Sequence, residues 1–241
     1  MIPWLDRHTP FPNAERALRH PNGLLAAGAD LSIDRLLTAY RHGIFPWFSE
    51  GDPLLWWSPD PRMVLPTDEL KVSRSLAKSI RNRGFEVRVD TAFAAVLEGC
   101  AGRRRDQPGT WLGPEMREAY LRLHQLGYAH SFETWRDGSL QGGLYGMAIG
   151  RMFFGESMFS RSTDASKVAL AALVGELRMR GFPLIDCQMN TSHLASLGAR
   201  EIRRADFLRA VSALVNYAEP PGTWRFTSRT MERLDEAPCH D

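Results

Sequence analysis

The fold is decided by residues 129–155, which read AHSFETWRDGSLQGGLYGMAIGRMFFG. Residues 129–136 and 139–149 have the composition of two strands, and Asp137-Gly138 between them is a strong signal for a tight hairpin turn. Gly150-Arg151 predicts a second turn, which leads into a third strand at residues 152–155. We therefore expect an antiparallel meander of three strands at the centre of the fold.

Strands alternate with helices on both sides of this meander. After it we expect a helix over about residues 164–180 ended by Gly181, a strand at 183–188, a short helix at 192–197, a strand at 199–203 and a helix at 206–215. Before it we expect strands at 63–66 and 85–90, helices at 73–82 and 91–99, and a helix opened by Pro114. This order indicates an α+β domain with a mixed, mostly antiparallel sheet, as in a GNAT-like (N-acetyltransferase-like) domain.

The first 62 residues have a different composition, rich in Pro, Gly and Trp. One helix is predicted there, capped by Ser32, with an apolar face from Ile33 to Tyr40 and an end at Gly43. Closely spaced prolines predict an irregular segment after it. We expect a small N-terminal domain at 1–62 and a GNAT-like catalytic domain at 63–241.

The overall composition is that of a globular protein without extreme charge. Of the 241 residues, 44% are hydrophobic and 24% are charged, and the net charge is +2, so any site for a polyanion must come from local clustering. The three cysteines, Cys100, Cys187 and Cys239, lack the spacing of metal ligands. We expect reduced thiols and a cytoplasmic location, because neither a signal peptide nor a membrane helix is indicated.

The segment Asp186-Cys187-Gln188 ends a predicted strand that is otherwise apolar. Side chains two residues apart leave the same face of a strand, so an ionised Asp186 is expected to accept a hydrogen bond from the Gln188 amide. That contact would turn the Gln188 carbonyl oxygen toward a substrate amine. Alternatively, both side chains satisfy nearby backbone groups. Cys187 faces the other way, and a buried thiol is the more common reading than a nucleophile.

Glu156 follows an apolar strand and has Phe153 and Met158 among its neighbours. A carboxylate in such surroundings suits the binding of an ammonium group, and the Met and Phe side chains suit a linear or aromatic group. A plain core cluster and a salt-bridged glutamate are two alternatives that explain the spacing at least as well. Lys167 lies in the first turn of the long helix, where an anion would compensate its charge; an exposed lysine is the alternative.

A stripe of basic residues follows one face of the helix at 73–82. Arg74, Lys78 and Arg81 share that face, and Arg83 and the run at 103–105 add to the local charge. Such a stripe suits a phosphate backbone, although a solvated face explains it too. Trp47 and Trp111 fall in loops, where a tryptophan can stack on a base or pack two domains together.

The sequence closely resembles the leucyl/phenylalanyl-tRNA–protein transferase family. The resemblance covers residues ~11 to ~210, with motifs in the order of the family. The matching segments are PNGLLA at 21–26, RHGIFPWF at 41–48, WWSPDPR at 56–62, EGCA at 98–101, GTW at 109–111, AHS at 129–131, GGLYG at 142–146, GESMFSR at 155–161, DCQ at 186–188 and ASLGA at 195–199.

The resemblance implies an enzyme that moves Leu or Phe, and Met less well, from charged tRNA to an N-terminal Arg or Lys, and so marks proteins for N-end rule degradation. The terminal adenosine would lie between Trp47 and Trp111. Asp186 and Gln188 match the proposed catalytic pair, and Glu156 matches an acidic residue near the donor's amino group. We also place Tyr40 among the substrate-binding residues. The pocket for the aminoacyl side chain maps to Leu144, Phe153, Met158, Leu170 and Ile185, and the surface for the tRNA body maps to Arg74, Lys78, Arg81 and Arg83.

Chemically, the aminoacyl ester is already activated, so the enzyme needs mainly to align the reactants, remove a proton from the amine and stabilise the oxyanion. We expect the Cys187 backbone N–H to serve the oxyanion, and we expect a monomer that needs no metal or cofactor. Departures from the family leave Asn190 and Thr191 open as contacts, and Leu144 stands where some members carry Met. Two other classes remain: an acetyl-CoA-dependent N-acetyltransferase, which the missing pyrophosphate-binding glycine loop disfavours, and a non-catalytic RNA-binding protein.

Overall fold

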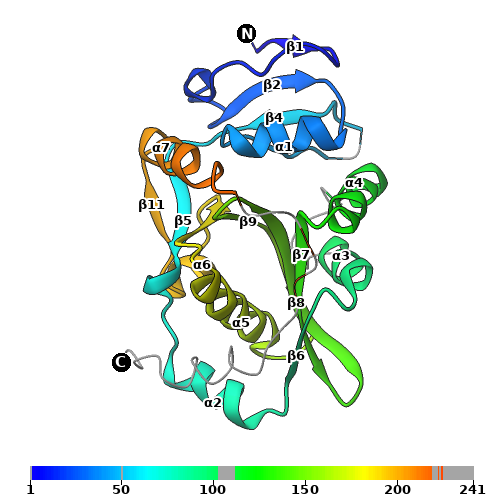
Figure 1. The fold of residues 1–241 in the computed structure, drawn as a ribbon, viewed down its shortest axis with the longest axis vertical. Coiled ribbons are helices and arrows are strands. Elements are labelled where there is room, and N and C mark those ends of the chain that lie inside the picture. Colours follow the sequence, from blue (N-terminus) through cyan, green and yellow to red (C-terminus); the bar gives the residue numbers. More distant parts are fainter. Residues whose placement is uncertain (1, 50, 103–111, 219–221, 223, 225–241) are drawn as a thin grey trace.

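The computed structural model describes residues 2–49, 51–102, 112–218, 222 and 224. Two sheets organise these residues, and Figure 1 shows the smaller one packed at one end of the larger. The small sheet has the order β1-β2-β4-β3 and is accompanied by helix α1. Its elements are β1 (Trp4–Leu5), η1 (Ala14–Arg16), β2 (Leu24–Gly28), α1 (Ile33–Arg41), β3 (Phe45–Pro46) and β4 (Leu55–Trp57).

Two details of the N-terminal prediction are wrong. The segment expected to be irregular contributes β3 and β4. Strand β4 forms because Trp56 is fully buried and its Nε1 donates to the Gly28 carbonyl at 2.9 Å. Pro46 is accommodated because β3 is an edge strand, where a missing N–H is tolerated. The predicted helix is confirmed as α1, but the Ser32 side chain does not cap it. The Ser32 backbone N–H is instead bound to Asp30 Oδ1 at 2.9 Å.

The large sheet has seven strands in the order β11-β5-β10-β9-β8-β7-β6. All neighbouring pairs are antiparallel except β9 and β10, so the expected mixed, mostly antiparallel sheet is confirmed. The strands are β5 (Arg62–Pro66), β6 (Glu86–Val89), β7 (Ala129–Arg136), β8 (Ser139–Ile149), β9 (Met152–Ser160), β10 (Leu184–Gln188) and β11 (Arg200–Ile202).

The central hairpin forms as its turn sequence predicts. Asp137 and Gly138 both have positive φ, 52° and 72°, which a type I′ turn requires and which Asp and Gly tolerate. The third strand runs farther than expected, to Ser160 instead of residue 155, because its outer half stays paired with β8 up to Gly142. That extension contains Glu156.

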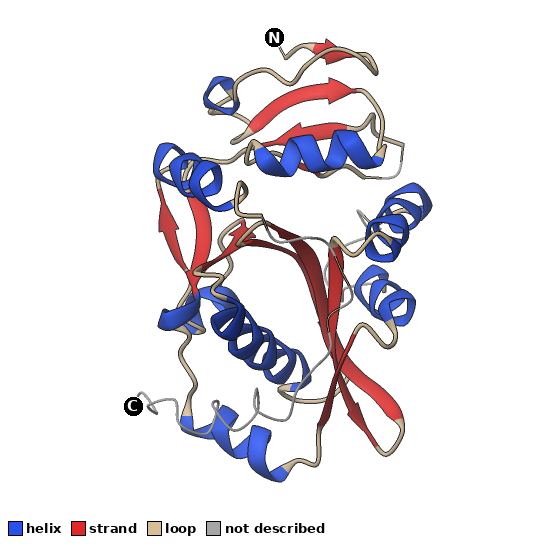
Figure 2. Ribbon diagram, viewed as in Figure 1, coloured by secondary structure: helices blue, strands red, loops and turns tan. Residues whose placement is uncertain are grey.

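Helices cover both faces of the large sheet (Figure 2). Helix α5 packs on one face, with α2 beside it, while α3 and α4 pack on the other. The helices are α2 (Arg74–Asn82), α3 (Phe93–Ala101), α4 (Pro114–Gln125), α5 (Ala165–Arg180), α6 (Ser192–Ser196) and α7 (Arg204–Leu214), with the 3-10 turn η2 (Thr67–Glu69). Within the described part of the chain, no helix has the length and apolar character to cross a bilayer.

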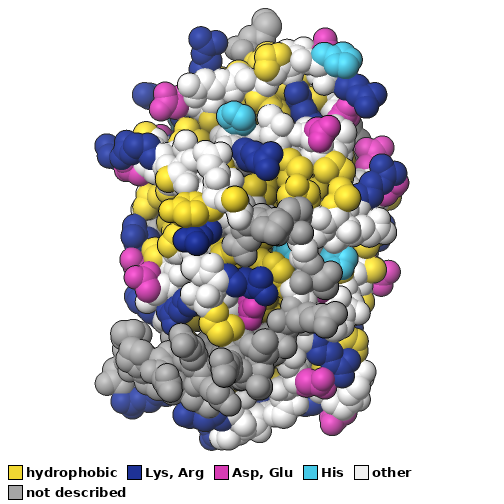
Figure 3. Space-filling view, in the orientation of Figure 1, with side chains coloured by type: hydrophobic (Ala, Val, Ile, Leu, Met, Phe, Trp, Pro, Cys, Tyr) yellow, Lys and Arg dark blue, Asp and Glu magenta, His cyan; other side chains and the backbone are white. Residues whose placement is uncertain are grey.

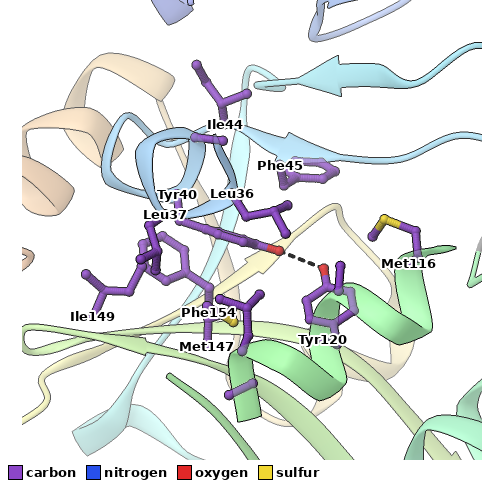
Figure 4. Close-up of a cluster of buried hydrophobic side chains, with 14 of the residues drawn as sticks. Leu36, Leu37, Tyr40, Ile44, Phe45, Met116, Tyr120, Met147, Ile149 and Phe154 are labelled. Carbon is purple, nitrogen blue, oxygen red and sulfur yellow. Dashed lines mark hydrogen bonds between the residues drawn. The ribbon is translucent and has the colours of Figure 1, made fainter. Parts of the chain in front are cut away.

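One apolar cluster joins the small sheet to the large one. Leu36 and Tyr40 of α1 and Phe45 of β3 pack with Tyr120 of α4 and Met147 of β8 (Figure 4). The expected boundary at residue 62 falls at the first residue of β5, just after the chain has passed from the small sheet to the large one. We keep the division into 1–62 and 63–241 as a proposal.

A candidate active site where strands β9 and β10 part

The one parallel pair in the large sheet, among its described strands, also holds the polar residues of interest. β9 and β10 are paired at Met152–Leu184, Phe153–Ile185 and Phe154–Asp186, where the pairing ends. Beyond that point β9 continues beside β8, and β10 continues beside β5. Glu156 and Gln188 therefore lie two residues past the last paired residues, on either side of the point where the strands separate.

Both residues lie at irregularities of their strands. The register of β8 and β9 goes from Gly146–Gly155 to Tyr145–Ser157, so Glu156 is the extra residue of a β-bulge. The register of β10 and β5 also shifts between Asp186 and Gln188. Bulges redirect side chains and are common beside active sites. Sequence reasoning missed both bulges.

Glu156 receives hydrogen bonds from three different elements. Tyr40 of α1 donates to Oε1 at 2.6 Å, and Tyr120 of α4 donates to Oε2 at 2.8 Å. The Gln188 amide donates to Oε1 at 3.2 Å. Burial raises the pKa of the Glu156 carboxyl to about 7, although these three hydrogen bonds lower it. Glu156 thus gains or loses its proton near neutral pH.

The two tyrosines also touch each other, with 2.7 Å between their hydroxyl oxygens (Figure 4). Burial raises the pKa of both tyrosines well above the ordinary value, so both keep their protons. Three oxygen–oxygen contacts then share two hydroxyl protons. A protonated Glu156 can donate to one tyrosine, which then donates to the other, so that all three contacts hold a proton. The cluster is built to hold one extra proton. The sequence analysis did not identify Tyr120 as a site residue; a hydroxyl among the buried residues of its helix was the available signal.

The predicted hydrogen bond between the Asp186 carboxylate and the Gln188 amide is absent from the site. Gln188 has φ 62° and the Cys187–Met189 turn closes around it, so the rule that alternate residues share a face fails here. Its side chain reaches Glu156 instead. With Nε2 bound to Glu156, the carbonyl oxygen of the amide points to the other side. Glu156, not Asp186, orients this amide.

Asp186 is fully buried and paired with Arg62, the first residue of β5. Arg62 Nε donates to Oδ1 at 2.8 Å and Nη2 donates to Oδ2 at 2.6 Å. Asp186 Oδ1 also accepts the backbone N–H of Gln188 at 2.9 Å. A carboxylate buried this deeply is costly unless it is paired, and Arg62 provides the opposite charge. This partner was missed, because the two residues are 124 positions apart.

Cys187 is partly buried against the apolar cluster on the α5 side. Burial raises the pKa of its thiol, which disfavours the reactive thiolate. The thiol is therefore a poor nucleophile, in line with the interpretation favoured from the sequence. Across the described ranges, no three His, Cys, Asp or Glu side chains gather closely enough to hold a metal ion.

The structure brings together all five residues predicted to line the aminoacyl pocket. They belong to one apolar cluster beneath α5, in which Leu144 of β8 is paired with Met158 of β9. Met158 is partly buried, whereas the other four are buried. The predicted residues are Leu144, Phe153, Met158, Leu170 and Ile185.

Trp47 follows β3 and is 39% exposed. The Trp47 and Trp57 rings meet edge to face, with 5.5 Å between their centroids. Trp57 Nε1 also donates to the backbone carbonyl of Trp47 at 2.6 Å. A supported, partly exposed ring of this kind can stack on a base. Trp111 and the arginines at 103–105 lie outside the described residues.

The basic stripe lies on the exposed side of α2, whose Leu76, Ala77 and Ile80 are buried. Arg74, Lys78, Arg81 and Arg83 are exposed, and Arg83 also donates to the Thr163 carbonyl at 3.2 Å. On the face drawn in Figure 3, basic and acidic side chains are interspersed. The Lys167 ammonium lies 3.3 Å from Asp164, so the anion opposite it is a side chain of its own helix start.

Comparisons with known proteins agree on one family. The family model described as leucyl/phenylalanyl-tRNA protein transferase matches residues 64–212, and the model of its N-terminal domain matches residues 29–60. A protein of that name from Chromobacterium violaceum is 61% identical over 229 residues, which covers 95% of this chain and 98% of the relative. One from Thiobacillus denitrificans is 62% identical, with 90% and 96% covered. The crystal structure of FemX matches with a TM-score of 0.47 and 11% identity, over 78% of this chain and 74% of that one.

The raised pKa of Glu156 makes a prediction about stability. A carboxyl whose pKa rises on folding, here from 4.5 to about 7, binds its proton more tightly when folded. Protonated Glu156 therefore adds to the free energy of unfolding in full at low pH, and this stabilisation is lost as the pH rises from about 4.5 through about 7. Between pH 5 and pH 8 the wild type should lose about 2–3 kcal/mol of unfolding free energy relative to Glu156→Gln. Urea unfolding of both proteins at each pH measures this, and parallel pH dependences would refute it.

Proposed function

The chain belongs to the leucyl/phenylalanyl-tRNA protein transferase family, and we propose that it moves Leu or Phe from charged tRNA to the N-terminal Arg or Lys of acceptor proteins. Membership makes it an aminoacyltransferase that acts on a tRNA and a protein. The finer proposal is that methionyl-tRNA is a poorer donor and that the new N-terminus marks the acceptor for N-end rule degradation. We place this activity in a monomer in the cytoplasm.

The observation that carries the proposal is the contact between Glu156 and Gln188 at the parting of β9 and β10. A carboxyl with a pKa of about 7 and an oriented amide lie where β9 and β10 part, and the same two strands contribute Phe153, Met158 and Ile185 to an apolar cluster that suits Leu or Phe. This combination matches a substrate with an ammonium group, a reactive carbonyl and an apolar side chain. In the proposal Glu156 binds the donor's ammonium group, and the apolar cluster opens to receive its side chain.

The transfer needs one proton to leave the attacking amine. The amine nitrogen bonds to the ester carbonyl carbon, the bond from that carbon to the ribose oxygen breaks, and the ribose oxygen takes up a proton. The Gln188 carbonyl oxygen accepts a hydrogen bond from the amine and aligns it. The Cys187 backbone N–H is the proposed donor to the oxyanion. In this proposal Asp186 does not contact the substrate; it holds the backbone N–H of Gln188.

The tRNA would contact two separate surfaces. Trp47, with Trp111 opposite it, is proposed to hold the terminal adenosine by stacking. The exposed basic side of α2 is proposed to bind phosphates of the tRNA body. In Figure 1 α2 lies at the end of the molecule away from the small sheet, a separation that suits a large, elongated substrate.

The proposal predicts a specific product. Incubation with leucyl-tRNA and a peptide that begins with Arg should lengthen the peptide by one leucine at its N-terminus, as mass spectrometry would show. The same peptide beginning with Ala should stay unchanged. Acetylation of the Arg peptide by acetyl-CoA would support the acetyltransferase alternative, and tRNA binding without any product from leucyl- or phenylalanyl-tRNA would support the RNA-binding one.

Gln188 and Cys187 should respond differently to truncation. Gln188→Ala removes the oriented amide and should lower kcat by ~10²-fold, with the KM for aminoacyl-tRNA little changed. Cys187→Ala should stay within about threefold of the wild type, because only its backbone N–H is involved. Single-turnover kinetics at saturating aminoacyl-tRNA test both, and an inactive Cys187→Ala enzyme would point to thiol chemistry.

The basic side of α2 should affect binding and not chemistry. For the double variant Lys78→Ala/Arg81→Ala we expect a higher KM for leucyl-tRNA. The slope of the logarithm of the tRNA binding constant against the logarithm of salt concentration should be smaller in magnitude by roughly 1–2. The rate with a short aminoacyl-adenosine donor should not change, because that donor cannot reach α2. Equal losses with both donors would place these residues outside the tRNA interface.

A further inference from the structure

Arg62 occupies the junction of three parts of the molecule. It opens β5 of the large sheet, and its guanidinium lies between the rings of Phe45 in β3 and Phe207 in α7, at 4.7 and 4.4 Å from their centroids. Its Nη1 donates to the Gly43 carbonyl at 3.3 Å, and its other nitrogens hold both carboxylate oxygens of Asp186. The side chains of Arg62 and Asp186 are 1% and 0% exposed.

The Gln188 backbone depends on this ion pair. Gln188 has φ 62°, and Met189 N–H donates to the Cys187 carbonyl at 2.8 Å, which makes Gln188 the central residue of a three-residue turn. Turns of this kind with positive φ are rare and strained for a residue with a side chain. The Gln188 N–H is bound by Asp186 Oδ1, the same oxygen that Arg62 Nε holds.

We propose that Arg62 is a positioning residue for the transfer reaction. It acts through Asp186: the two-point contact fixes the carboxylate, the carboxylate fixes the Gln188 N–H, and the strained turn then aims the Gln188 amide at Glu156 and the substrate amine. This inference rests on the proposed function. It also gives Asp186 a structural connection to Gln188, in place of the amide contact expected from the sequence.

The physical reason for an arginine here is geometric. Only a planar guanidinium can hold two carboxylate oxygens and stack between two aromatic rings. A lysine keeps the charge but offers one point of contact, so it leaves the carboxylate free to rotate. A displacement of about 1 Å in a reacting group can lower a rate by ~10²-fold, which makes turnover a sensitive measure of this contact.

A purely structural role is the alternative, because Arg62 also joins the small sheet to α7. Arg204 provides a matched control. It starts α7 and donates to the Ser58 carbonyl at 2.7 Å and the Glu15 carbonyl at 3.3 Å, so it too joins α7 to the N-terminal part. Its hydrogen-bond partners Ser58, Glu15 and Asp60 all lie before β5.

The test compares Arg62→Lys, Arg62→Met, Arg62→Met/Asp186→Asn and Arg204→Met, each with kcat and KM for leucyl-tRNA and an Arg-initiated peptide. Arg62→Met leaves a buried carboxylate unpaired and should lower the Tm by roughly 10 °C. The double variant removes both charges and should recover most of that loss. Arg62→Lys and the double variant should still show kcat reduced by ~10-fold or more, with each KM within about threefold of the wild type.

Arg204→Met should keep the wild-type kcat. The inference is overturned if Arg62→Lys and the double variant keep kcat within about threefold, if they change KM alone, or if Arg204→Met loses as much kcat as they do. Wild-type enzyme is the reference throughout: if it transfers nothing, the proposed function fails, whereas an active wild type with fully active Arg62 variants removes only the role of Arg62. If Arg62→Met fails to fold, Arg62→Lys and the double variant decide the question.

Discussion

The separation of β9 from β10 is the constraint on which the site depends. Parallel pairing holds the two strands together for three residue pairs and then ends. Beyond that point no described strand is hydrogen-bonded to either of them on the side that faces the other, although β9 stays paired with β8 and β10 with β5. A continuous ladder would place backbone at the position proposed for the substrate. The bulge at Glu156 and the register shift before Gln188 occur on opposite sides of this gap, and together they turn both side chains to a common point.

Two carboxylates lie close to this gap, and their surroundings differ. Asp186 faces a guanidinium and a backbone N–H, and it is fully buried, so its charge is balanced in place. Glu156 faces neutral donors only, two tyrosines and one amide, and burial raises its pKa to about 7. Environments that separate the behaviour of neighbouring carboxylates commonly mark a division of roles. Here one carboxylate maintains geometry and the other can exchange a proton.

Local sequence signals predicted the elements of the large sheet well, since period, turn residues and helix ends are written within a few residues of each other. The Asp137-Gly138 hairpin and the helix ended by Gly181 are examples. The site was harder to predict. That Gln188 turns away from Asp186 depends on a bulge against β5, and the Arg62–Asp186 pair joins positions far apart in the chain. Strands β3 and β4 were missed because their pairing depends on the burial of Trp56 against the rest of the small sheet.

The Tyr–Glu cluster shows that the small sheet is more than a platform beside the large sheet. Tyr40 comes from α1, Tyr120 from α4 and Glu156 from β9. The N-terminal part therefore supplies one of the two hydroxyl groups that donate to the Glu156 carboxylate. Arg62 makes the same connection behind the site, through Gly43 and Phe45. A shift of the small sheet would therefore disturb Glu156 directly and Gln188 through Asp186. Because both polar groups depend on the same interface, the proposed alignment of the amine would be coupled to the position of the N-terminal part. A ligand that bound across Trp47 and the gap between β9 and β10 would then favour the aligned arrangement.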